Sequence, residues 1–223
     1  MIFLIILLIL IFIVANVLGA YYTITNANSP NYGDISNAVK NEADCKSYCD
    51  STANCGGAAH HIPSQRCYIK NDLAKIVPMT DVNLYIKIVG PFLRIDSPPS
   101  DINLREIKLY NNGVQLSGLF ATISRTLNDD VYFRPSKCID NDVNNNGLYN
   151  NGLCHSGGSN PWLVIDLRGQ QANKIVIYNR IECCGERIIG ANVKYTNDYV
   201  GNDIVWKSNI PNVNSPDYTF NIW

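Results

Sequence analysis

Charge of either sign is scarce in this sequence. Asp, Glu, Lys and Arg make up 17% of the residues, and the net charge at pH 7 is −1. No cluster of basic residues occurs. A protein that binds nucleic acid or an anionic membrane through its overall field needs such a cluster. We therefore expect no nucleic-acid partner and a local binding site.

The common enzyme motifs are also missing. We find no Gly-rich phosphate loop, no Gly-x-Ser-x-Gly and no His-Glu-x-x-His. The chain has only three histidines. Two of them, His60 and His61, are adjacent in a predicted strand, so their side chains point to opposite faces and cannot readily share a metal. The sequence predicts a binding protein rather than an enzyme.

The single long apolar run lies at the N-terminus. Ile2 to Val14 carries no charge, and the small residues up to Ala20 suit cleavage by a signal peptidase. We interpret residues 1–20 as a secretory signal peptide. The alternative is an uncleaved anchor over residues 2–18, because the run is near the length that spans a bilayer. We expect a secreted or surface-displayed protein, bound to a membrane only if the leader is retained.

Eight cysteines follow the leader, and this even number is typical of a disulfide framework in an oxidising compartment. A zinc site is the alternative, based on the short spacing Cys45-x3-Cys49-x5-Cys55. The histidines lie elsewhere, however, and oxidation would remove the thiolate ligands. Four bridges are possible among the eight: Cys45, Cys49, Cys55, Cys67, Cys138, Cys154, Cys183 and Cys184.

Residues 21–90 are predicted to form a small α+β domain. Asn41 can cap a helix that carries acidic residues in its first turn, and Cys45 and Cys49 then share one face of it. Predicted strands surround the helix at residues 21–24, 34–39, 58–61, 67–70 and 84–87.

This first segment resembles the PAN/apple module. The resemblance rests on Cys45-x3-Cys49, on Cys55-Gly56-Gly57, on Cys67 to Lys70 and on the closing strand Leu84 to Lys87. It implies bridges from Cys45 to Cys67 and from Cys49 to Cys55. It also implies a module that binds protein or glycan, while a spacer held up by the same cysteines is the alternative.

Residues 91–223 have a different pattern, with short runs rich in β-forming residues separated by turn signals such as Asn111-Asn112-Gly113. No long helical period is present. The pattern predicts an all-β sandwich or jelly roll, so the fold class of the whole chain is mainly β. The predicted strands include residues 92–95, 104–109, 162–167, 174–178 and 191–195.

The most specific motif is Asn179 to Ile188, which contains two arginines, two glutamates and the adjacent cysteines 183 and 184. Cys154-His155 and Asn160-Pro161-Trp162 precede it. Guanidinium groups supply planar donors to neighbouring hydroxyls, a neutral histidine donates or accepts, and a carboxylate holds a guanidinium in place. Residues of these types suit recognition of a sugar.

These residues resemble the fucolectins, which are F-type lectins within the discoidin or coagulation factor 5/8 type C superfamily. The resemblance implies that one fucose is bound by His155, Arg180 and Arg187. Glu182 would support Arg180, and a disulfide between Cys183 and Cys184 would pack against the sugar. The alternative is that both arginines bridge surface glutamates and that His155 only caps a turn.

The same resemblance implies a structural calcium ion near the loop from Lys137 to Asp142. Carboxylates of Glu106, Asp140 and Asp142 and carbonyls of Arg105 and Lys137 would be the ligands. A plain turn, in which the two aspartates cap backbone amides, is the alternative. Cys138 and Cys154 would close this loop. The strands 92–95 and 104–109 look like the family's last two strands placed first, which predicts a circular permutation.

Our leading hypothesis from the sequence is a lectin for terminal fucose or a related sugar. A single shallow site binds weakly, so useful avidity would need several copies and possible homo-oligomers. The first segment would offer a surface for protein partners. The alternative is a cell-adhesion or structural protein whose discoidin-like domain binds protein while its sugar site is vestigial.

Overall fold

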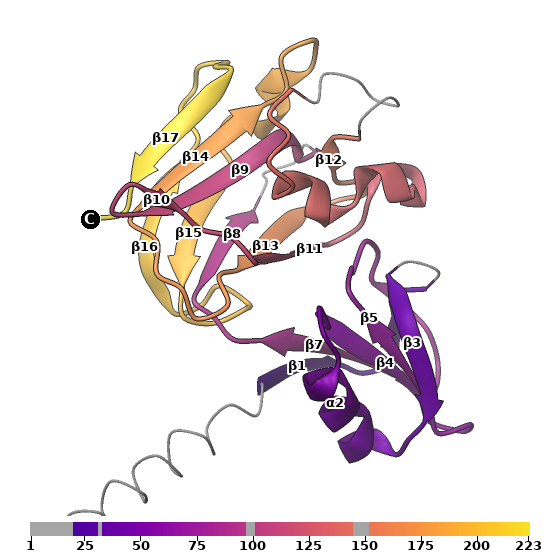
Figure 1. The fold of residues 1–223 in the computed structure, drawn as a ribbon. Coiled ribbons are helices and arrows are strands. Elements are labelled where there is room, and N and C mark those ends of the chain that lie inside the picture. Colours follow the sequence, from indigo (N-terminus) through magenta and orange to yellow (C-terminus); the bar gives the residue numbers. More distant parts are fainter. Residues whose placement is uncertain (1–19, 31–32, 97–100, 145–151) are drawn as a thin grey trace, which may run out of the picture.

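The computed structural model describes residues 20–30, 33–96, 101–144 and 152–223 (Figure 1). Its architecture is mainly β, as the sequence predicts, with a small disulfide-bonded α+β unit followed by a larger β-sandwich. All of the predicted leader except Ala20 lies outside the described residues. No helix within these ranges is long and apolar enough to cross a membrane.

The first unit is a five-stranded antiparallel sheet in the order β1-β7-β4-β5-β3. Helix α2 (Glu42–Ser51) packs on one of its faces, and Asn41 caps that helix by accepting a hydrogen bond from the backbone N–H of Asp44 at 2.9 Å. A two-stranded ribbon, β2 (Ala27–Asn28) with β6 (Val77–Pro78), adjoins the sheet. The sheet strands are β1 (Ala20–Ile24), β3 (Asp34–Val39), β4 (Gly57–His61), β5 (Arg66–Lys70) and β7 (Val82–Ile88).

Two disulfides hold α2 to this sheet. Cys45 is bonded to Cys67 on β5, and Cys49 is bonded to Cys55 just before β4, which confirms both pairings implied by the PAN resemblance. The zinc alternative is thereby wrong. All four cysteines are buried in a small core with Ile69 and Tyr85. In a unit with so thin a core, each bridge contributes on the order of 2–4 kcal/mol.

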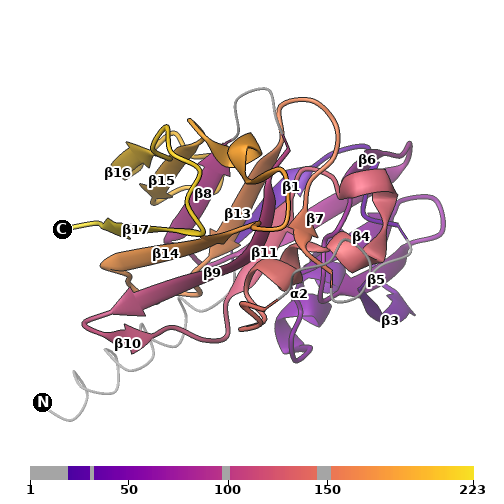
Figure 2. The same ribbon diagram turned by 90° about the horizontal axis from the view of Figure 1, so that it is seen from above.

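The second unit is a sandwich of two antiparallel sheets (Figure 2). One sheet has the order β10-β9-β14-β17, with β12 also paired to β9, and the other has the order β11-β13-β8-β15-β16. The bounds are β8 (Phe92–Asp96), β9 (Asn103–Asn111), β10 (Val114–Gln115), β11 (Phe120–Ile123), β12 (Cys154–His155), β13 (Trp162–Asp166), β14 (Lys174–Asn179), β15 (Asn192–Thr196), β16 (Ile204–Asn209) and β17 (Asp217–Asn221).

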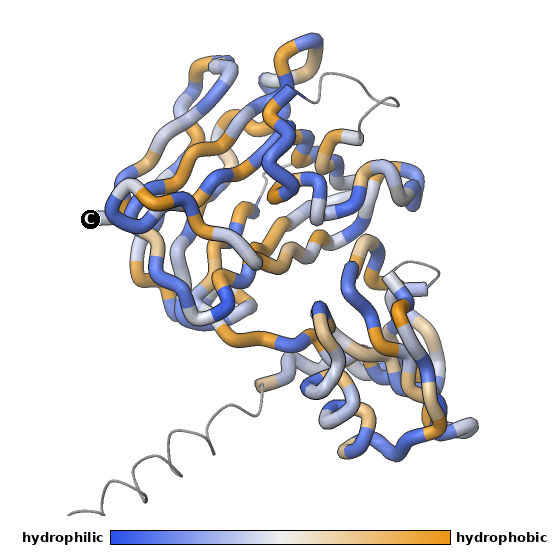
Figure 3. Tube along the Cα trace, in the orientation of Figure 1, coloured by the Kyte–Doolittle hydropathy of each residue, from blue (hydrophilic) through white to orange (hydrophobic). Residues whose placement is uncertain are grey.

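The core of the sandwich follows from the two-residue period of its strands. Leu93 and Ile95 of β8 face Ile175 and Ile177 of β14 within one cluster of buried side chains. Figure 3 shows hydrophobic stretches along the chain in the sandwich, interrupted by hydrophilic residues. The β9–β10 hairpin turns at Asn112 and Gly113, both of which have positive φ, as a type I′ turn requires.

The two units pack directly against each other. Asp166, 3% exposed, accepts hydrogen bonds from the backbone N–H groups of Val89 and Gly90 in the connecting segment, each at 3.0 Å. The ring of Phe120 on β11 lies so close to Gly56 that a Cβ there would be 1.8 Å from it. One apolar cluster includes side chains from both units. The connection therefore does not act as a free linker.

Candidate functional site

The predicted sugar-binding residues lie around the end of β14, where the chain leaves the sheet and passes into a short 3₁₀ helix at Gly185–Ile188. Asn179, fully buried, organises this exit. Its side-chain amide donates to the carbonyls of Gly185 at 2.9 Å and Ser215 at 3.1 Å, and its Oδ1 accepts from the N–H of Arg180 at 2.9 Å. Sequence reasoning missed this role of Asn179.

Arg180 is held by Glu182 as predicted. Its Nε donates to Oε1 of Glu182 at 2.7 Å, and the arginine is only 3% exposed. Among the described residues, the terminal nitrogens of this guanidinium have no hydrogen-bond partner. A buried cation fixed through one nitrogen thus keeps its outer donors available for a ligand.

His155 on β12 is 1% exposed and lies edge-on to Phe133, with ring centroids 5.6 Å apart. Burial lowers its pKa, so the neutral ring is favoured at pH 7. Its Nδ1 lies 2.7 Å from the carbonyl oxygen of Ser156 and must carry the proton of that hydrogen bond. Nε2 is then a hydrogen-bond acceptor.

The charges of Asp101, Arg180 and Arg187 all act on the pKa of His155, Asp101 raising it and the two arginines lowering it. Arg187, moderately exposed, lies with its NH1 3.4 Å from Oδ2 of Asp101. Both arginines are therefore near enough for their charges to act on the histidine. The structure also shows that Arg187 pairs with Asp101, whereas the alternative interpretation paired it with a surface glutamate.

Two residues of this region escaped the sequence analysis. Asp101 has no motif around it, and only the fold places it beside Arg187. Asn103 on β9 is opposite His155 in the β12–β9 pairing and is fully buried. Its Nδ2 donates to the carbonyl of Cys184 at 3.5 Å, and its Oδ1 has no partner among the described residues. A buried acceptor without a partner is uncommon and suits a ligand hydroxyl or a water.

The predicted bond between Cys183 and Cys184 is not formed. Both are free thiols, Cys183 exposed and Cys184 half-buried. Consecutive Cα atoms are about 3.8 Å apart, whereas disulfides usually join Cα atoms about 4.4–6.8 Å apart, so a bond between neighbours needs a distorted peptide. The third bridge is instead Cys138–Cys154, as predicted, and it fixes the strand that carries His155.

The structure also brings Glu106 on β9 to the loop in which calcium was predicted. Glu106 is 1% exposed, and its two carboxylate oxygens accept from the backbone N–H groups of Ile107 at 2.9 Å and Asn141 at 2.6 Å. Burial raises its pKa to about 8, and the nearby charge of Asp140 adds to this shift. The charges of Glu106 and Asp140 therefore act on each other at this loop, and Lys108 partly offsets the pKa shift at Glu106.

Asp140 and Asp142 each accept a backbone N–H within the loop, whereas the predicted roles of the Arg105 and Lys137 carbonyls stay predictions. Asp140 caps the N–H of Asp142 at 3.0 Å and pairs with Lys137 at 3.1 Å, as in the plain-turn alternative. The guanidinium of Arg105 donates to backbone carbonyls, including that of Val143 at 2.8 Å. No group of three or more His, Cys, Asp or Glu side chains suited to a metal occurs in the described parts of the chain.

Comparison with known proteins gives partial matches. Fucolectin-4 of Anguilla japonica is 40% identical over 65 residues, which cover 28% of this chain and 36% of that protein. Fucolectin-6 of the same species is 39% identical over 67 residues, covering 29% of this chain and 35% of that protein. The chain thus spans little more than a third of the relatives' length. No protein-family model matches, and no solved structure gives a significant match.

These matches support a fucolectin-like domain in the chain. They do not extend to the PAN-like interpretation of the first unit or to the circular permutation, and both stay predictions. The two strands that the permutation concerns, β8 and β9, do form, and each is an inner strand of its sheet.

Proposed function

We propose that the chain is a lectin that binds terminal fucose at the cluster of His155, Arg180 and Arg187. The observation that carries this proposal is the buried Arg180, paired with the more exposed Glu182, together with the buried, neutral His155. The geometry offers fixed donors from the guanidinium groups and one fixed acceptor at Nε2 of His155. The partial similarity to fucolectins supports the same conclusion.

Binding at this site needs no covalent step. Glu182 and Asp101 orient the two guanidinium groups, so little side-chain entropy is lost when a sugar is bound. A hydroxyl that accepts from Arg180 can also donate to His155. The exposed Cys183 thiol and the neighbouring Ile181, 51% exposed, provide weakly polar surface for the methyl-bearing edge of fucose.

A structural calcium ion belongs to the same proposal. Glu106 and Asp140 would be its carboxylate ligands, because the N–H of Asn141, in the same loop as Asp140, donates to Glu106. Main-chain carbonyls of the loop from Lys137 would complete its shell. The ion would hold this loop against β9 and would take no part in sugar recognition.

Three disulfides favour an oxidising location, so we place the protein outside the cell or on a surface. Fucosylated glycans are its proposed partners. Binding by one such site is weak, and assembly or dense display would raise its avidity. The first unit would be available for protein contacts.

The test is binding to a glycan array with free fucose as competitor. Arg180→Ala removes the central donor, and a hydrogen bond to a charged group is worth about 1.5–3 kcal/mol, so we expect about tenfold to hundredfold weaker binding. Lys207→Ala, an exposed cation on β16 of the opposite sheet, is the matched control and should bind normally.

Fucose-inhibited binding that Arg180→Ala weakens would support the proposal. Equal binding by both variants would mean that the sugar binds elsewhere on the molecule. If the folded protein binds no glycan on the array, the result would favour the adhesion alternative, in which the domain binds protein.

A further inference from the structure

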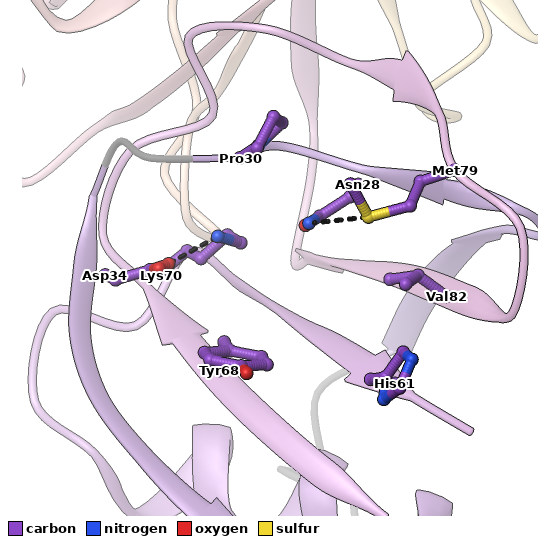
Figure 4. Close-up of a pocket in the computed structure, with 8 residues that line it drawn as sticks. All are labelled: Asn28, Pro30, Asp34, His61, Tyr68, Lys70, Met79 and Val82. Carbon is purple, nitrogen blue, oxygen red and sulfur yellow. Dashed lines mark hydrogen bonds and ion pairs between the residues drawn. The ribbon is translucent and has the colours of Figure 1, made fainter. Parts of the chain in front are cut away.

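The first unit contains a cavity of about 350 Å³ that takes no part in the site described above (Figure 4). We call it the N-terminal pocket. Its volume is within the range of small-molecule sites, about 300–1,000 Å³. Polar and apolar side chains line it, including Asn28, Asp34, His61, Tyr68, Lys70 and Met79.

The sheet itself creates this hollow. Tyr68 and Lys70 are two apart on β5, so they project from the same face, opposite to the face on which Cys67 and Ile69 pack against α2. Across the ladder, Ala59 is paired with Tyr68 and Gly57 with Lys70. Asn28 of the short ribbon forms a rim and contacts Met79 through a hydrogen bond of 3.4 Å.

A charged pair lies inside the pocket. Lys70 is 1% exposed, and its ammonium donates to Oδ1 of Asp34, whose side chain is 42% exposed. Burial lowers the pKa of Lys70, and Asp34 opposes this shift. An ammonium has three donors. Only one of them is used within the described residues, so a buried cation retains unused hydrogen-bonding capacity.

Further polar groups face the same space. The hydroxyl of Tyr68 has no hydrogen-bond partner in the described part of the chain, and His61 uses only Nδ1, which lies 2.6 Å from the Ser64 hydroxyl. Figure 4 shows both rings at the wall of the pocket, opposite Asn28 and Met79. The wall thus combines a flat aromatic ring with several separate donors and acceptors.

We infer that the N-terminal pocket is a second ligand site, which binds a neutral monosaccharide ring. The ammonium of Lys70 and the carboxylate of Asp34 cancel in charge, so neither an anionic nor a cationic ligand is favoured. A sugar hydroxyl both accepts and donates, which matches a pair that offers unused donors on Lys70 beside an unused acceptor on Asp34. Tyr68 and Met79 supply apolar surface for the face of the ring.

The inference is tested by saturation-transfer NMR on the full chain carrying Arg180→Ala, which weakens the proposed C-terminal sugar site. The probes are glucose, galactose and mannose, with glucuronate and glucosamine as charged rings of the same size. We expect at least one neutral sugar to bind, and Tyr68→Ala and Lys70→Met each to weaken that binding about tenfold or more.

Lys46→Met is the matched control, because Lys46 also pairs with a carboxylate, Glu42, but on α2 at the opposite face of the sheet. It should bind as the parent does. His61→Ala, at a partly exposed position, replaces Lys70→Met if the latter does not fold. Preference for either charged ring, absence of neutral-sugar binding, or full binding by folded Tyr68→Ala would each overturn the inference. Because every protein compared carries Arg180→Ala, a difference in binding between them reports on the N-terminal pocket and not on the fucose site.

Discussion

Glu106 is a carboxylate in surroundings that favour its neutral form. Its pKa is about 8 in the folded chain, against an ordinary value of 4.5, and burial is the main cause. A raised pKa means that the folded state holds the proton more tightly than the unfolded state. The resulting stability is complete below about pH 4.5 and is lost as the pH rises through about 8.

We therefore expect the free energy of unfolding to fall between about pH 5 and about pH 9, and to fall less in Glu106→Gln. Urea unfolding of both proteins at several pH values measures this difference. If the free energy of unfolding depends on pH equally in both proteins, the raised pKa of Glu106 would be contradicted. If calcium binds here, adding it at the higher pH should raise the melting temperature of the parent protein and leave that of Glu106→Gln unchanged.

At the scale of elements, sequence reasoning works where the signal is local. Short runs of β-forming residues predict β8, β13 and β14, and Asn41 predicts the start of α2 because its side chain caps the first turn. The two arginines and His155 were found because they belong to a motif. Asp101 and Asn103 were not found, since their positions depend on the pairing of β9 with β12, about fifty residues apart in sequence.

The element that presents Arg180 depends on close backbone packing at Gly185. A Cβ there would lie 2.6 Å from the carbonyl oxygen of Arg180 and 2.6 Å from Oδ1 of Asn214. Gly185→Ala must therefore shift the segment that carries the arginine, at a cost of about 1–3 kcal/mol. We expect fucose binding to weaken at least about tenfold, because a misplaced donor loses its hydrogen bond.

Binding measured by titration, together with the unfolding free energy, checks this expectation. Gly113→Ala is the control, because its φ of +82° makes alanine unfavourable there, yet an added Cβ would meet nothing within 4 Å. That variant should lose stability and keep its binding. Unchanged binding in Gly185→Ala would show that the loop tolerates the shift.

At the scale of the whole molecule, the interface between the two units determines whether the proposed sites act as one body. Apolar side chains of both units share a cluster, and Asp166 anchors the connection through Val89 and Gly90. Removing this carboxylate leaves a buried N–H without a partner, which costs about 1–3 kcal/mol. Asp166→Ala should therefore uncouple the units.

Calorimetry distinguishes units that unfold together from units that unfold separately. The parent protein should unfold in a single transition, because the shared cluster and the Asp166 anchor together join the units, whereas Asp166→Ala, which keeps only the cluster, should show two. Two transitions in the parent would mean that the units are independent. Rigid coupling also affects binding, because the two proposed sugar sites would lie at a fixed separation on one chain. They should favour glycans or surfaces on which the sugars have that same separation. This preference should be lost in Asp166→Ala, while each site keeps its own affinity.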